Sequence, residues 1–149
     1  MEQERKKRII LIGRSAAGKT TLCQRINHED LTYYKTQTVQ VVNESIIDTP
    51  GEYVQRLYFR GCLMVSSADA DIVVFVQSAE DDMTWFPPGY DSQFGKPAVG
   101  VVTKADLATE QQIETAKEYL RMAGAKEIFV TSSVSGKGVD DFLKFLGYV

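Results

Sequence analysis

Apolar residues along the chain fall into two patterns, short continuous runs and longer stretches in which they recur every three or four positions. The runs at residues 8–12, 71–77 and 98–102 are rich in branched side chains, and residues 127–131 form a further short run of strand-forming residues. Nearly continuous apolar composition is typical of strands buried on both faces of a parallel sheet. The sequence therefore predicts four such strands.

Helical spacing marks four segments that lie between or after these runs. Thr109 is a suitable N-cap for the third of them, and Gly124 is a suitable residue just beyond its end. In the last segment, four apolar side chains fall on one helical face. The predicted helices cover residues 20–26, 53–65, 109–122 and 139–146.

A hairpin is predicted between the first and second helices. Residues 36–42 alternate loosely and are rich in strand-forming side chains, Asn43-Glu44 suits a tight turn, and residues 45–48 form another strand. Strands that alternate with helices imply a doubly wound α/β fold. We expect one domain over residues 1–149, with a six-stranded, mostly parallel sheet, helices on both faces and a ligand at the carboxyl ends of the strands.

Composition narrows the classes of function. The chain has 149 residues and a net charge of −3, so it has no global positive field for nucleic acid; Arg5-Lys6-Lys7-Arg8 is one local basic cluster. No apolar run approaches the ~20 residues that a membrane span needs. The two cysteines lack C-x-x-C spacing, and no signal-peptide pattern is present. We expect a cytoplasmic protein that binds neither nucleic acid nor membrane.

The segment between the first predicted strand and the first predicted helix reads G-x-x-x-x-G-K-T, and this context favours a phosphate-binding loop. Glycines let the backbone N–H groups approach phosphate oxygens, and Lys19 supplies a positive charge for the β- and γ-phosphates. We therefore expect a nucleoside triphosphate as ligand. The candidate phosphate-binding residues are Gly13, Arg14, Ser15, Ala16, Ala17, Gly18, Lys19, Thr20 and Thr21, together with Gly51.

A second segment, Asp48-Thr49-Pro50-Gly51, follows a predicted strand about 30 residues beyond this loop. Asp48 and the Thr20 hydroxyl are suitable Mg²⁺ ligands, and the Gly51 N–H could reach a γ-phosphate. Thr36 and Thr38 lie on the same side of an extended segment, and either could meet Mg²⁺ and the γ-phosphate. We favour Thr36, and expect Lys19, Thr36 and Glu52 to be the catalytic residues, with Thr20, Thr36 and Asp48 as metal ligands.

Base recognition is predicted at two later strand ends. The Lys104 stem could lie along a purine face, while Asp106 could accept hydrogen bonds from N1–H and the 2-amino group of guanine. After the next strand, a backbone N–H of Thr131-Ser132-Ser133 could donate to guanine O6. The candidate base-binding residues are Thr103, Lys104, Asp106, Ser132 and Ser133.

Taken in order, these motifs resemble those of the translation-factor-like small GTPases, over nearly the whole chain. The sequence is more similar still to the EutP/PduV family of ethanolamine- and propanediol-utilisation proteins, through Leu11–Ser15, Tyr34–Gln37, Ile47–Tyr53 and Phe86–Gly89. The resemblance implies a P-loop, small-G-protein-like NTPase fold, GTP or ATP with Mg²⁺, and an association with bacterial microcompartments, whose shell or enzymes would be partners.

Several positions depart from the broad GTPase pattern. Thr103 replaces an asparagine whose amide can bond both the base and the phosphate loop, and Ser15-Ala16 replace two glycines. Glu52 stands where many relatives carry a glutamine that positions water. A carboxylate there is repelled by the γ-phosphate, so we expect slow hydrolysis.

Two other functions stay open: an ATP-dependent kinase that phosphorylates a small carboxylate such as acetate, and a docking module in which nucleotide is only structural. In the kinase, Arg14 and Arg25 could supply positive charge at a site for the carboxylate. The aromatic segment of residues 85–90, with Phe94, either covers the sheet in place of a helix or forms an exposed docking patch.

Overall fold

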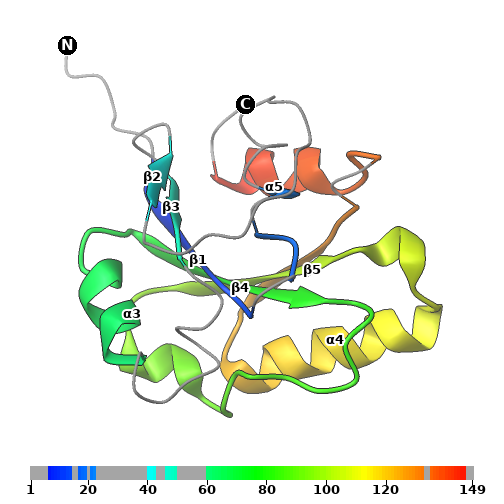
Figure 1. Cartoon of the computed structure of the whole chain (residues 1–149), viewed down its shortest axis with the longest axis horizontal. Helices are drawn as coiled ribbons and strands as arrows, with labels where there is room; N and C mark the ends of the chain where they lie inside the picture. The colour runs from blue at the N-terminus through cyan, green and yellow to red at the C-terminus, as the bar shows by residue number, and fades with distance from the viewer. Residues whose placement is uncertain are drawn as a thin grey trace.

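The computed structural model describes residues 7–14, 17–19, 21–22, 40–42, 46–49, 60–132 and 135–146. In these residues a sheet has the strand order β2-β3-β1-β4-β5-β6, in which all neighbours are parallel except β2 and β3 (Figure 1). The elements are β1 (Ile9–Ile12), β2 (Gln40–Val42), β3 (Ile46–Asp48), α3 (Arg60–Ser67), β4 (Ile72–Ser78), η2 (Tyr90–Gln93), β5 (Ala98–Thr103), η3 (Ala105–Leu107), α4 (Glu110–Ala123), β6 (Glu127–Val130) and α5 (Val139–Leu146).

The six-stranded α/β architecture predicted from the sequence is confirmed, including the antiparallel pairing of β2 with β3. β2 is described at Gln40–Val42, within the strand predicted at residues 36–42, and residues 36–39 of that prediction lie outside the described residues. The predicted turn at Asn43-Glu44 and residues 53–59 of the second predicted helix lie outside them as well. The last predicted helix coincides with α5.

Both faces of the sheet are covered, as its apolar strands require. In β1, Ile10 and Ile12 join a buried cluster on the face of α3 and α4, whereas Ile9 and Leu11 join one on the face of α5 (Figure 1). All four β1 side chains are 0% exposed. This two-sided burial fixes β1 near the middle of the sheet and so fixes where the following loop begins.

Helix α4 has clear local signals at both ends. Thr109 and Gln112 form a capping box, in which each side chain bonds the backbone N–H of the other residue. Gly124 ends the helix with a φ of 106°, a conformation that glycine adopts without strain. The helix packs closely on β5 at Gly100, where an added Cβ would lie 2.8 Å from Leu120 Cδ1.

The aromatic segment that follows β4 covers the sheet. Phe86, Tyr90 and Phe94 are buried, and their rings surround Phe75 of β4 at centroid distances of 4.9, 5.6 and 6.2 Å. Trp85 is partly buried and packs against the same cluster. The structure therefore confirms that these rings replace a helix on this face, and the exposed docking patch does not hold, because its central rings face the core.

Among the residues that the structure describes, we find no helix with the length and apolar character needed to span a bilayer.

Candidate functional site

The predicted phosphate-binding loop starts at the carboxyl end of β1, where the order of the strands changes direction. β1 is flanked by β3 on one side and by β4 on the other, with Leu11 opposite Asp48 and Ile12 opposite Phe75. In open α/β sheets, ligands bind beyond the carboxyl ends of the strands at such a switch point. The fold therefore brings the phosphate-loop segment to the expected position.

At two positions of this segment, the surrounding structure explains why the residue is glycine. A Cβ added at Gly13 would lie 2.6 Å from the carbonyl oxygen of Val76, so β4 passes too closely for any larger residue. Gly18 has a φ of 95°, and a Cβ there would lie 3.2 Å from Thr103 Oγ1. Both glycines of the G-x-x-x-x-G pattern are thus required by the path of the backbone.

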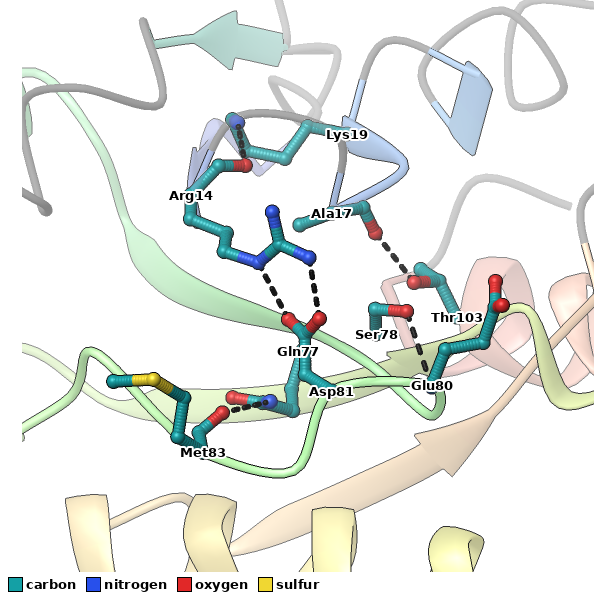
Figure 2. Close-up of polar contacts among 9 residues, drawn as sticks. All are labelled: Arg14, Ala17, Lys19, Gln77, Ser78, Glu80, Asp81, Met83 and Thr103. Atoms are coloured by element: carbon teal, nitrogen blue, oxygen red, sulfur yellow. Dashed lines mark hydrogen bonds and ion pairs between the residues drawn. The ribbon is translucent and has the colours of Figure 1, made fainter. Parts of the chain in front are cut away.

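Lys19 is held against the loop that precedes it. The residue is 6% exposed, and its Nζ donates to the Arg14 carbonyl oxygen at 3.1 Å (Figure 2). The same carbonyl accepts the Ala17 N–H at 3.1 Å, and the Leu22 N–H donates to the Gly18 carbonyl at 2.9 Å. The described residues of this segment therefore include a turn from Arg14 to Ala17 and a helical hydrogen bond that starts at Gly18, an arrangement suited to a phosphate-binding loop.

Thr103, at the end of β5, connects the predicted base site to the phosphate loop. It is 2% exposed, and its hydroxyl donates to the Ala17 carbonyl oxygen (Figure 2). A hydroxyl has one proton to donate. That proton is donated to the Ala17 carbonyl, so Thr103 bonds the predicted phosphate loop. The Thr103 hydroxyl therefore has no proton left to donate to a base.

The other predicted base-binding residues gather around the ends of β5 and β6. Lys104 has a φ of 59°, and Asp106 is exposed in η3. The Ala105 N–H donates to the Thr131 carbonyl at 3.2 Å, which joins the two strand ends. The structure thus brings Lys104 and Asp106 to the edge of the sheet that carries the phosphate loop.

Ser132 is buried, and its polar groups are engaged within its own turn. Its N–H donates to the Lys137 carbonyl at 2.9 Å, and its Oγ accepts the Ser135 N–H at 3.4 Å. The Thr131 N–H donates to the Val102 carbonyl at 2.7 Å, so of the three backbone N–H groups predicted as base donors, two are used within the fold and the third belongs to Ser133, which lies outside the described residues.

The predicted metal and catalytic residues are described only in part. The Asp48 backbone pairs with Leu11, and the buried Thr49 hydroxyl donates to the Leu11 carbonyl at 2.6 Å, which fastens the end of β3 to β1. Outside the described residues lie Ser15, Ala16, Thr20, Thr36, Thr38, Gly51, Glu52 and the Asp48 side chain. In the described part of the chain, no three His, Cys, Asp or Glu residues form a metal-binding group.

One contact at this edge was missed by the sequence reasoning. Arg14 forms a two-point ion pair with Asp81, in which Nε lies 2.6 Å from Oδ2 and Nη2 contacts Oδ1 (Figure 2). The hydrogen bond to Asp81 is the main cause that raises the pKa of the Arg14 guanidinium above its usual value. The available signal was the acidic run Glu80-Asp81-Asp82, which begins two residues after the end of β4.

The contact between Thr103 and Ala17 leads to a stability prediction. Thr103→Val keeps the shape of the side chain but leaves the Ala17 carbonyl without its donor, which should lower the free energy of unfolding by about 1–2 kcal/mol. Chemical denaturation measures this change. Thr115→Val on the exposed face of α4 is the control and should change it by less than about 0.5 kcal/mol. Equal effects of the two variants would contradict the assigned contact.

The chain is similar in sequence to known proteins over most of its length. The model of the PduV-EutP family, described as ethanolamine utilisation - propanediol utilisation, matches residues 6–148. The chain is 42% identical over 140 residues to the propanediol utilization protein PduV of Citrobacter freundii, covering 94% of this chain and 93% of that protein. It is 29% identical over 141 residues to the probable acetate kinase EutP of Escherichia coli K12, covering 94% and 89%. The probable acetate kinase EutP of Salmonella typhimurium is also 29% identical, over 142 residues that cover 94% of this chain and 89% of that protein.

Proposed function

The chain belongs to the PduV-EutP family, and on that premise we propose that it binds a nucleoside triphosphate with Mg²⁺, prefers GTP and hydrolyses it slowly. The family description supports a role in ethanolamine or propanediol utilisation. Association with a bacterial microcompartment, through a shell or enzyme partner, is part of the proposal.

The observation that carries the proposal is the geometry of the phosphate loop. Gly13 and Gly18 occupy positions that no larger residue fits without strain, and Lys19 is held against the Arg14 carbonyl at the switch point of the sheet. Backbone N–H groups and an ammonium group gathered at one loop are suited to the negative charge of a triphosphate. This geometry supports triphosphate binding more directly than it supports any particular use of the γ-phosphate.

The oxygen donors near this loop are suitable ligands for Mg²⁺. Mg²⁺ prefers carboxylate, hydroxyl and phosphate oxygens. In the proposal, Thr20, Asp48 and Thr36 hold the ion, and β3 ends with Asp48 beside the strand that leads into the phosphate loop. Mg²⁺ would neutralise charge on the β- and γ-phosphates.

The preference for GTP rests on Asp106 and Lys104. Asp106 is an exposed carboxylate at the carboxyl edge of the sheet, beside a turn that is bonded to the end of β6. In the proposal it accepts hydrogen bonds from two guanine donors, while the Lys104 stem covers the purine face. Thr103 contributes through the phosphate loop, because its donor is already used on Ala17.

Slow hydrolysis follows from Glu52, whose carboxylate is repelled by the γ-phosphate. Glu52→Gln removes this repulsion and keeps a group that can orient water, so the GTP turnover rate should rise or at least hold, while GTP affinity changes little. Steady-state phosphate release by both proteins measures the effect. A collapse of turnover in Glu52→Gln would instead identify Glu52 as a base.

The EutP relatives are named probable acetate kinases, which favours a second candidate, the transfer of phosphate to a small carboxylate. Against this candidate, Arg14 is already engaged by the Asp81 carboxylate in the described structure. The deciding experiment compares turnover of GTP and ATP with and without acetate. GTP hydrolysis that acetate does not affect supports the main proposal, whereas ATP turnover that requires acetate and yields acetyl phosphate supports the kinase. Binding without turnover of either nucleotide would favour the docking module.

A further inference from the structure

The ion pair between Arg14 and Asp81 joins two loops that are far apart in the sequence. Arg14 is the first variable residue of the phosphate loop, and Asp81 follows β4, 67 positions later. The pair is two-pointed and partly buried, with side-chain exposures of 31% for Arg14 and 13% for Asp81. Two-point arginine–carboxylate pairs fix orientation as well as distance, so this contact restrains the start of the phosphate loop.

Asp81 is itself firmly placed, because hydrogen bonds hold its loop on both sides. The Gln77 side chain donates to the Met83 carbonyl at 3.1 Å, and the Ser78 hydroxyl accepts the Glu80 N–H at 3.2 Å (Figure 2). Tyr119 of α4 donates to the Asp82 carbonyl at 2.7 Å. The carboxylate is therefore anchored to β4 and to α4, and it can serve as a fixed point for Arg14.

The Arg14 backbone is the part of the phosphate loop that holds Lys19. Its carbonyl oxygen accepts both the Lys19 ammonium and the Ala17 N–H. A restraint on the Arg14 side chain therefore also restrains the Arg14 carbonyl. Through that carbonyl it restrains the Lys19 ammonium, which binds the phosphates in the proposed function.

We propose that Asp81 is a positioning residue for triphosphate binding, which acts through Arg14 to fix the carbonyl that places Lys19. This inference rests on the proposed function. Asp81 contacts neither base nor phosphate in the proposal, so its loss weakens binding of GTP and ATP by the same factor and leaves the preference between them unchanged.

Asp81→Asn also removes a negative charge near a site for a polyanion and leaves the Arg14 charge uncompensated, a change that favours phosphate binding. This electrostatic contribution is screened by salt, whereas the loss of the two-point contact with Arg14 changes the geometry of the loop at any salt concentration. The affinities are therefore compared at high ionic strength, where the charge contribution is small and the loss of positioning decides the sign.

The test is a double-mutant cycle of Asp81→Asn and Lys19→Ala, with the affinities for GTP and ATP measured by titration in Mg²⁺. Asp81→Asn should weaken both nucleotides about tenfold in the wild-type background and less than about twofold in the Lys19→Ala background, since residues that act as a unit are non-additive. Asp81→Glu, which keeps the carboxylate, should recover part of the affinity. Asp82→Asn makes the same charge change at the neighbouring exposed side chain and should leave affinity unchanged.

Each outcome bears on the inference. Unchanged or tighter binding by folded Asp81→Asn overturns it, as does an equal loss in both backgrounds or a change in the ratio of GTP to ATP affinity. Should Asp81→Asn fail to fold, Arg14→Lys keeps the charge of the loop and removes the two-point geometry, and the same criteria apply to it. Wild-type protein that binds neither nucleotide overturns the proposed function, and this inference with it.

Discussion

Lys19→Ala should weaken the binding of triphosphate by about ten- to a hundredfold. The ammonium is fixed against the Arg14 carbonyl and is 6% exposed, so it is already placed where the proposed phosphates lie. Charge-assisted hydrogen bonds contribute roughly 1.5–3 kcal/mol, which corresponds to that range of affinity. Titration with GTP in the presence of Mg²⁺ measures the loss.

Lys126→Ala is the matched control for this experiment. Lys126 is exposed beyond the end of α4, and its removal changes the net charge by the same amount. The Lys126→Ala variant should bind GTP with the affinity of the wild-type protein. A folded Lys19→Ala variant that also binds GTP like the wild type would refute the assignment of the phosphate loop.

Asp106→Asn should move the base preference from GTP towards XTP. The carboxylate would accept from guanine N1–H and the 2-amino group, whereas an amide can donate to the carbonyl that xanthine carries at position 2. Sites built to hydrogen-bond a group discriminate strongly against analogues that lack it, so the ratio of GTP to XTP affinity should fall by at least about a hundredfold. The phosphate contacts, and so the binding of the triphosphate moiety, should be unchanged.

Competition by GTP, ATP and XTP for the wild-type and variant proteins provides the measurement. Asp69→Asn, at an exposed turn after α3, makes the same chemical change away from the candidate site and should keep the wild-type order of affinities. If the wild type binds ATP as well as GTP and Asp106→Asn leaves this order alone, η3 is only the turn that precedes α4. The kinase alternative would then be favoured.

The fold was largely predictable because its signals are local. β1, β4 and β5 are nearly continuous apolar runs, and α4 carries both a capping box and a terminal glycine, so their sequences specify them with little reference to the rest of the chain. The segment between β4 and β5 was harder to predict. Phe86, Tyr90 and Phe94 are spaced four residues apart, but Pro87 and Pro88 interrupt any helix. The burial of these rings depends on Phe75, a residue that becomes their neighbour only after folding.

The part of the candidate site that could be predicted is the part that a sequence motif specifies. Gly13, Gly18 and Lys19 lie as the G-x-x-x-x-G-K pattern requires, since steric freedom and spacing are properties of the sequence itself. The partner of Arg14 could not be predicted, because Asp81 is one of three consecutive acidic residues and only the paths of β1 and β4 select it. The use of the Thr103 hydroxyl on Ala17 likewise depends on how closely β5 approaches the phosphate loop.

The position of the triphosphate is tested most directly by the backbone amide resonances of the protein during a titration with GTP and Mg²⁺. Phosphate oxygens bound at the loop would shift the N–H signals of Gly18 and Lys19 in a saturable manner. Gly95 and Gly124, which precede β5 and β6 at the opposite edge of the sheet, should keep their signals. Saturable binding of GTP that leaves Gly18 and Lys19 unshifted, or no binding at all, would contradict a triphosphate site on this loop.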